Sequence, residues 1–315
     1  ELKIPAEKLG ISVFKGDKDA PKDEESAKIW ISLGIPKERV AYLPKKDNWW
    51  GPAGITGPCG PDTEMFFWSG EEKPPKKFDP DDKRWIEIWN DVFMQYNKTQ
   101  EGKYIPLKQK NVDTGMGVER TIAILQGKST VFETELFMPI VNRIKKLSKI
   151  ENPNEKQLKS IRIIADHLRS SIFLLGDENK IAPSNLDQGY VLRRLIRASI
   201  RHGRLLNINE DFTQDIAKET LKIYEKDYPI LKQNETFILE ELKKEENKFK
   251  KTLLLGLKQF HKLVKNKKLD GKQAFVLFST YGFPIEMTEE LALEHKIKIN
   301  KKEFEKEFEK HQELS

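Results

Sequence analysis

The sequence predicts an α+β fold in which a β-rich first half is followed by an all-helical second half. Residues 1–150 contain short extended runs, aromatic clusters and turn signals, whereas residues 151–315 show helical periodicity nearly throughout. Strands and helices do not alternate along the first half as they do in parallel βαβ folds, so we expect an antiparallel sheet with flanking helices. A length of 315 residues also suits two domains better than one core.

Loop-forming segments divide the first half. Residues 51–62 contain four glycines and three prolines, which is turn chemistry and predicts no regular element. Residues 70–83 (GEEKPPKKFDPDDK) predict an exposed, mobile insertion. The polar run 151–156 (ENPNEK) predicts the domain boundary, so that the domains span 1–150 and 151–315.

Between these loops we expect a helix and a strand. Asp23 is placed to cap a helix from Glu24 to Leu33, which Gly34 stops. Residues 84–93 (RWIEIWNDVF) alternate as in a strand. The alternation puts Ile86 and Ile88 on one face and Trp85, Glu87 and Trp89 on the other.

The second half predicts long amphipathic helices. One is marked by apolar residues at helical spacing and ends at Gly176: Ile161, Ile164, Ala165, Leu168, Ile172 and Leu175. A second runs from Asp187 to His202 and is expected to bury Val191, Leu195 and Ile200, with its arginines largely on the opposite side. These are Arg193, Arg194, Arg197, Arg201 and Arg204. A third covers 235–265, and residues 301–313 predict a last helix that continues toward a missing neighbour.

Composition excludes several classes of protein. The 56 basic and 50 acidic residues give a net charge of +6, which mildly favours a polyanionic partner, although lysine-rich composition can also reflect the host genome. No apolar run reaches membrane-spanning length and no secretory signal is evident, so a cytoplasmic location is the default expectation. Cys59 is expected to be a small residue in a tight turn and not a catalytic thiol. The five histidines lack metal-ligand spacing, and neither a hydrolytic triad nor a P-loop is found.

Residues 112–120 (VDTGMGVER) combine three chemical roles. Asp113 supplies a carboxylate, Gly115 and Gly117 let backbone approach a flat ligand, and Arg120 presents a charged fork suited to phosphate. Such glycines are also common in loops that bind nothing, and Asp113 can simply cap the following turn. The segment alone therefore favours a nucleotide site only moderately.

Five segments in order strengthen this interpretation. They are DNWW (47–50), TGPCGPDTE (56–64), WIEIWNDVFMQYN (85–97), VDTGMGVER (112–120) and ADHLRSSIF…PSNLDQGYVLRRLIRASIRHG (165–203). Together they closely resemble the alanyl-tRNA synthetases, a family of class II aminoacyl-tRNA synthetases, over essentially the whole chain. The resemblance implies part of the class II antiparallel sheet, with VDTGMGVER as motif 3, followed by a helical tRNA-binding domain.

The resemblance implies an alanine pocket in the first domain. Asp113 would hold the α-ammonium group of alanine by a charge-assisted hydrogen bond. Asn90 and Val92 would border the pocket together with Trp50, whose bulk suits a site for a methyl side chain, and Gly115 would line it. Without the resemblance, Trp50 reads more simply as a core aromatic.

The resemblance also implies an ATP site that uses Mg²⁺. Arg120 would contact the γ-phosphate, while Gly115 and Gly117 would admit the adenylate against backbone. Glu87 would be a magnesium ligand. Strict alternation places Glu87 and Asn90 on opposite faces, so both can serve one site only if the strand bends.

For the second domain the resemblance implies binding of the acceptor stem of tRNA(Ala), identified by a G·U wobble pair. Asn185 in the PSN turn is the expected contact to this pair. The family places an aspartate at a second contact, where FSTYGFP (278–284) has Ser279, so that reading of the pair is expected to be relaxed or routed through water. The arginines of the preceding helix are read as contacts to RNA phosphates, with a solvated face as the alternative: Arg193, Arg194, Arg197 and Arg201.

Motifs 1 and 2 of the class II synthetases and the family's editing and C-terminal domains are not found in the sequence. We therefore expect an internal piece of an alanine–tRNA ligase, unable to form alanyl-adenylate without an N-terminal catalytic segment supplied in cis or in trans. The alternative is a tRNA-binding fragment without catalytic activity.

Overall fold

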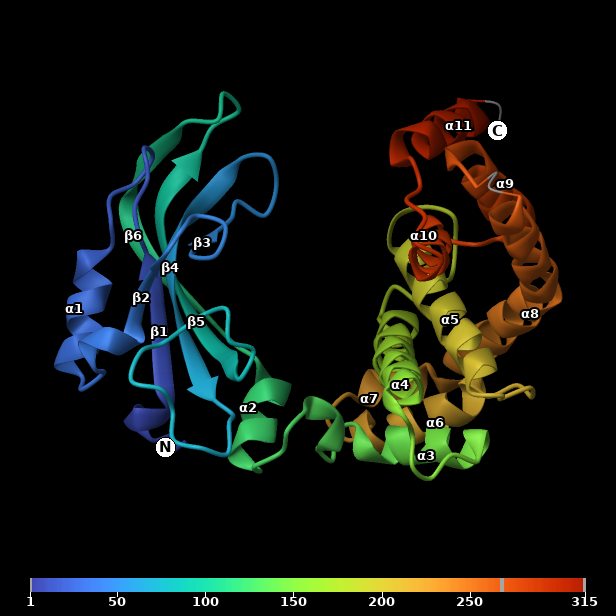
Figure 1. Cartoon of the computed structure of the whole chain (residues 1–315), viewed down its shortest axis with the longest axis horizontal. Helices are drawn as coiled ribbons and strands as arrows, with labels where there is room; N and C mark the ends of the chain where they lie inside the picture. The colour runs from blue at the N-terminus through green and yellow to red at the C-terminus, as the bar shows by residue number, and fades with distance from the viewer. Residues whose placement is uncertain (1, 267–268, 314–315) are drawn as a thin grey trace. The chain divides into compact units, whose positions relative to one another are not determined.

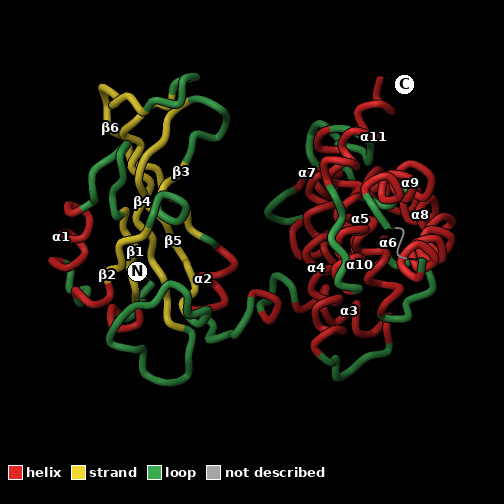
Figure 2. The backbone as a smooth tube through the Cα atoms, turned by 45° about the horizontal axis from the view of Figure 1, so that its top comes forward, coloured by secondary structure: helices red, strands yellow, loops and turns green. Residues whose placement is uncertain are grey.

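The computed structural model describes residues 2–266 and 269–313 and divides the chain into two compact units, residues 1–136 and 137–315 (Figures 1 and 2). The first contains a β-sheet and the second is helical, which confirms the predicted α+β class. The division falls before the predicted boundary, because helix α3 (Met138–Ser148) packs against helices of the second unit through Ile140 and Ile144. The polar run 151–156 is a connection within that unit.

Six strands form one mixed sheet in the first unit. They are β1 (Leu9–Phe14), β2 (Val40–Leu43), β3 (Trp49–Trp50), β4 (Gly57–Trp68), β5 (Trp85–Lys98) and β6 (Tyr104–Met116). The order is β2-β1-β4-β5-β6, with β3 also paired to β4. The expectation of a wholly antiparallel sheet was wrong in one place, since β1 and β2 are parallel while the other pairs are antiparallel.

A helix connects the two parallel strands. This helix, α1 (Glu24–Ser32), begins at Asp23, whose side chain accepts a hydrogen bond from the backbone N–H of Ser26, as the predicted cap requires. Ile11 and Val13 of β1 are buried beneath it. One face of the sheet is therefore covered by α1, and the alternate residues of the strands point to the other face.

The segment 51–62 was wrongly predicted to lack regular structure, because β4 begins at Gly57. Gly60 allows β4 to pack closely against β5, since a Cβ at this position would lie 1.8 Å from the carbonyl oxygen of Phe93. The pairing of β4 with β5 also shifts register between Cys59 and Asp62. Cys59 is fully buried in this strand and not in a tight turn, and burial raises the pKa of its thiol.

The insertion 70–83 is anchored at one point. Phe78 is 1% exposed and packs among Phe66, Trp68 and Trp85, while most of its neighbours in the loop are exposed. This aromatic cluster closes one end of the sheet on the face opposite α1.

The second unit consists of helices. They are α3, α4 (Glu155–Gly176), α5 (Asp187–Leu205), α6 (Thr213–Tyr224), α7 (Pro229–Gln233), α8 (Glu235–Lys265), α9 (Gly271–Tyr281), α10 (Ile285–Glu294) and α11 (Lys301–Glu313). The bounds of α8 and α11 match the prediction, and the six apolar residues expected to be buried on α4 are fully buried. The neighbour of α11 is α9, against which Phe304 and Phe308 pack (Figure 1). None of the described helices is long and apolar enough to cross a membrane.

We predict that Phe78→Ala destabilises the first unit by about 3–5 kcal/mol, because it empties a fully packed aromatic site. All six tryptophans lie in residues 1–136, so urea unfolding followed by tryptophan fluorescence reports on this unit. Lys77→Ala, at an exposed neighbouring position, is the control. Equal unfolding midpoints for the two variants would contradict the anchoring role.

Candidate functional site

A row of polar residues crosses the face of the sheet opposite α1. The strand register places Ser12 of β1 beside Glu64 of β4, Glu64 beside Asn90 of β5, and Asn90 beside Gly115 of β6. Residues paired directly across antiparallel strands project to the same side of the sheet. The row therefore brings together Asn90 and Gly115, two of the predicted site residues.

A second row lies next to the first. Asp62 of β4 pairs with Val92 of β5, which pairs with Asp113 of β6. Asn90, Val92, Asp113 and Gly115 are thus neighbours on one surface. Val92 is buried, whereas Asp113 is exposed and accepts a hydrogen bond from the backbone N–H of Thr114 at 2.9 Å. Trp50 is 39% exposed on β3, where it pairs with Gly60.

A β-bulge adds Glu87 to this face. Met65 pairs with Trp89, but the next residue of β4, Phe66, pairs with Glu87, so Ile88 is the extra residue of the bulge. Glu87 therefore projects to the same side as Asn90, and the bend that both roles require is present. The bulge also moves Trp89 to the face of Met65, which corrects the predicted strand faces.

Arg120 lies on helix α2 (Val118–Leu125), which follows β6 after Gly117. Its Nη1 donates to the carboxylate and to the backbone carbonyl of Glu87, each at 3.1 Å. The two groups expected to contact phosphate and Mg²⁺ are therefore adjacent and paired with each other. Because both side chains reach solvent, this pair stabilises the protein only weakly and can open for a ligand.

The two glycines of VDTGMGVER, Gly115 and Gly117, each lie close to the side chain of a predicted site residue. A Cβ on Gly115 would lie 2.8 Å from Oδ1 of Asn90, so glycine here leaves room for the amide beside it. A Cβ on Gly117 would contact the side chain of Arg120 at 3.3 Å. Glycine at these two positions therefore leaves space for the side chains of Asn90 and Arg120.

The sequence analysis missed a buried network beside these rows. Asn48 Nδ2 donates to Oδ1 of Asp62 at 3.0 Å and to Oγ of Ser12 at 2.8 Å, and Ser12 Oγ donates to Glu64 at 2.9 Å. Burial raises the pKa of Asp62 to about 6, and the charge of Glu87 adds to this effect. Burial also raises the pKa of Glu64 to about 7, with a further contribution from the charge of Asp62. The signal was available in the segments DNWW and TGPCGPDTE, whose polar residues were left without roles.

Among the carboxylates of this face, Glu87 is the one predicted to hold a divalent cation. Within the described residues there is no group of three or more histidine, cysteine, aspartate or glutamate side chains able to hold a metal ion. A single carboxylate such as Glu87 suits Mg²⁺ that is bound mainly through substrate phosphates and water.

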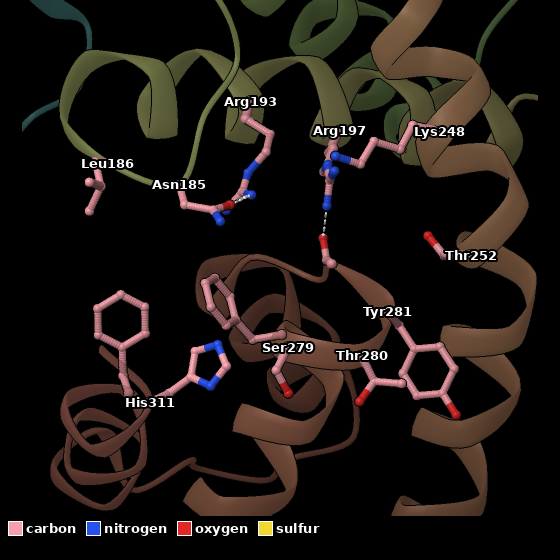
Figure 3. Close-up of a pocket in the computed structure, with 13 residues that line it drawn as sticks. Asn185, Leu186, Arg193, Arg197, Lys248, Thr252, Ser279, Thr280, Tyr281 and His311 are labelled. Atoms are coloured by element: carbon pink, nitrogen blue, oxygen red, sulfur yellow. Dashed lines mark hydrogen bonds between the residues drawn. The ribbon is translucent and has the colours of Figure 1, made fainter. Parts of the chain in front are cut away.

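A second candidate site lies in the helical unit. A cavity of about 590 Å³ is lined by Asn185 and Arg193 on one side and by residues 278–282, at the end of α9, on the other (Figure 3). Asn185 and Ser279, which are far apart in the sequence, thus line one cavity. The Nη1 of Arg193 donates to Oδ1 of Asn185 and so orients the amide.

Of the five arginines expected on one face of α5, three are buried and Arg204 is exposed. Val191 is 40% exposed, whereas Arg193, Arg197 and Arg201 are buried, so the prediction was wrong at these positions, while Ile200 is buried as predicted. Arg197 donates to Glu245 and to the carbonyl of Gly282, and Arg201 pairs with glutamates of α10. Arg194 is partly exposed and pairs with Glu286 at 2.8 Å. Carboxylates within the unit pair with Arg194, Arg197 and Arg201, so charge spacing alone did not predict which arginines are buried. Contact of these arginines with RNA phosphates stays a prediction.

Comparison with known proteins gives a consistent result. The family model described as tRNA synthetases class II (A) matches residues 1–315. The alanine–tRNA ligase of Treponema denticola is 52% identical over 323 residues, covering 100% of this chain and 54% of the relative. That of Borreliella afzelii is 49% identical over 320 residues with the same coverage, and that of Thermotoga sp. strain RQ2 is 42% identical over 325 residues, covering 36% of the relative. The chain spans about half the length of the first two relatives.

The raised pKa values of Asp62 and Glu64 predict a pH-dependent stability. Between about pH 4 and pH 7 the folded unit retains protons that the unfolded chain has released, so the free energy of unfolding falls as the pH rises. In the double variant Asp62→Asn/Glu64→Gln we expect the free energy of unfolding to fall less between these two pH values. The expected difference from the parent is about 1–3 kcal/mol. Urea unfolding followed by tryptophan fluorescence measures it, and the circular dichroism of the tryptophan-free helical unit is the internal control. Parallel pH profiles for variant and parent would refute the assignment.

Proposed function

The chain belongs to the alanyl-tRNA synthetase family, and on this basis we propose that it supplies two parts of an alanine–tRNA ligase. The first is the motif 3 part of an adenylation site, and the second is a set of helices that bind the acceptor stem of tRNA(Ala). The observation that carries the proposal is the register that places Asn90, Val92, Asp113 and Gly115 on one face.

In the proposed alanine pocket the charge of Asp113 binds the α-ammonium group, and the amide of Asn90 lies one row away to position the carboxylate. Val92 supplies apolar surface between them. Trp50 and Gly115 complete the pocket. A small apolar site of this kind discriminates between side chains that differ by one methylene by only about 1–3 kcal/mol.

In the proposed ATP site Arg120 leaves Glu87 and turns to the γ-phosphate, where its charge stabilises the departing pyrophosphate. Gly117 permits this movement because no Cβ crowds the arginine stem. The freed carboxylate of Glu87 is the group that would hold Mg²⁺ against the phosphates.

In the proposed acceptor-stem site Asn185 and Ser279 contact the base pair from two sides of the cavity. Arg193 and Arg197 hold Asn185 and Gly282 in place and do not contact phosphates in this proposal.

A second candidate function is tRNA binding without catalysis. The helical cavity is built within one unit, whereas Asp113, Gly115 and Arg120 are exposed in the first unit. This difference favours RNA binding by the chain alone and adenylate formation only with further catalytic groups. ATP–pyrophosphate exchange by the 315-residue chain above background would contradict this division.

We predict that Asp113→Asn lowers alanine activation by at least about 10²-fold, since it removes the charge that binds the ammonium group. The measurement is ATP–pyrophosphate exchange in a chimera in which this chain replaces the matching segment of the Treponema denticola relative. Asp91→Asn, on the opposite face of the same sheet, is the matched control. Equal rates for the two variants would exclude Asp113 as the alanine anchor.

We predict that Asn185→Ala lowers affinity for an acceptor-stem hairpin with a G·U pair at the third position about tenfold, as expected for one base contact. Fluorescence anisotropy with the 315-residue chain measures binding. A hairpin with a G·C pair tests discrimination, and Asn179→Ala, at an exposed asparagine away from the cavity, is the control. Unchanged affinity and discrimination in Asn185→Ala would count against the proposed site.

A further inference from the structure

The cavity that contains Asn185 and Ser279 has a third wall, formed by α11. Phe308 and His311 of this helix line the cavity together with residues of α5, α8 and α9. We infer that His311 is a direct contact to the edge of the RNA base pair that enters the cavity, on the side opposite Asn185. The inference rests on the proposed acceptor-stem function and assigns a further specificity-determining residue to that site.

Aromatic packing fixes the place of His311. Phe304 and Phe308 of α11 pack against Phe278 with ring centroids 5.7 and 5.5 Å apart. The imidazole itself lies 5.6 Å from the ring of Phe275, edge to face. Because Phe275, Phe278 and Ser279 all lie on α9, these contacts hold the imidazole against the helix that carries Ser279, and both His311 and Ser279 line the cavity (Figure 3).

The charge of the cavity suits RNA. Its thirteen lining residues include the cations Arg193, Arg197 and Lys248 and no aspartate or glutamate. Arg197 pairs with Glu245, which does not line the cavity, whereas Lys248 is exposed. A cavity with cationic and aromatic walls attracts a phosphate-bearing ligand with planar bases.

His311 has the chemistry that the position requires. A serine hydroxyl is short, and Ser279 sits at the end of a helix on one wall. A neutral imidazole carries both a donor and an acceptor on a longer, rigid side chain, so it can reach a base edge that serine cannot. With Asn185 on the facing wall, the pair would be contacted from both sides (Figure 3).

The test compares two histidines of the same unit. His311→Ala is expected to weaken binding of the hairpin with the G·U pair about fivefold, the size of one lost hydrogen bond, and to leave the G·C hairpin nearly unchanged. His311→Gln, which retains a donor and an acceptor, is expected to keep most of the affinity. His261→Ala is the matched control, because His261 is also exposed and packs on a phenylalanine, 5.5 Å between ring centroids, but does not line the cavity.

The results separate the inference from the proposed function. If His311→Ala binds both hairpins like His261→Ala while Asn185→Ala is impaired, His311 is not a contact and the acceptor-stem site stands. An equal loss for both hairpins in His311→Ala would overturn the base-edge contact. If the parent chain does not distinguish the hairpins and Asn185→Ala has no effect, the proposed function itself fails. Circular dichroism melting of each variant establishes that the helical unit is folded.

Discussion

The register between β4, β5 and β6 is the constraint on which the candidate adenylation site depends. Backbone pairing places Asp62, Val92 and Asp113 in one row and Glu64, Asn90 and Gly115 in the next. A slip of one residue would turn each of these side chains to the opposite face. The bulge at Ile88 is part of the same constraint, because the extra residue brings Glu87 to this face and so beside Arg120.

In the helical unit the corresponding constraint is the buried pairing of arginine with glutamate. Arg197 joins three elements, since it lies on α5, pairs with Glu245 of α8 and donates to the carbonyl of Gly282 after α9. Breaking a buried pair of this kind leaves an uncompensated charge, which costs about 3–5 kcal/mol. Arginines that resemble an RNA-binding stripe in sequence therefore define the positions of the helices around the cavity.

Helix positions could be predicted from the sequence because they depend on local signals. The cap at Asp23, the apolar spacing of α4 and the long charged pattern of α8 all act within one element. The wrong predictions concern segments whose structure depends on contacts with residues far away in the sequence. Pairing with β3 and β5 made a strand of residues rich in glycine and proline, and carboxylates on α8 and α10 buried the arginines of α5. The residues of VDTGMGVER were identifiable by type, and Asn48 and Asp62 lay in segments already singled out. Their connection to each other and to Ser12 required knowledge of which strands are neighbours.

The bond between Arg193 and Asn185 restricts what Asn185 can recognise. Its carbonyl oxygen accepts from Arg193, so the amide presents its NH₂ group to a ligand. In the shallow groove of an RNA duplex every base pair offers acceptors, whereas only pairs containing guanine add an amino donor. In the proposed acceptor-stem site, this orientation directs the NH₂ group of Asn185 toward an acceptor on a base edge. In the same proposal, oxygen and nitrogen acceptors on the facing wall, which carries Ser279 and His311, would accept from the guanine amine.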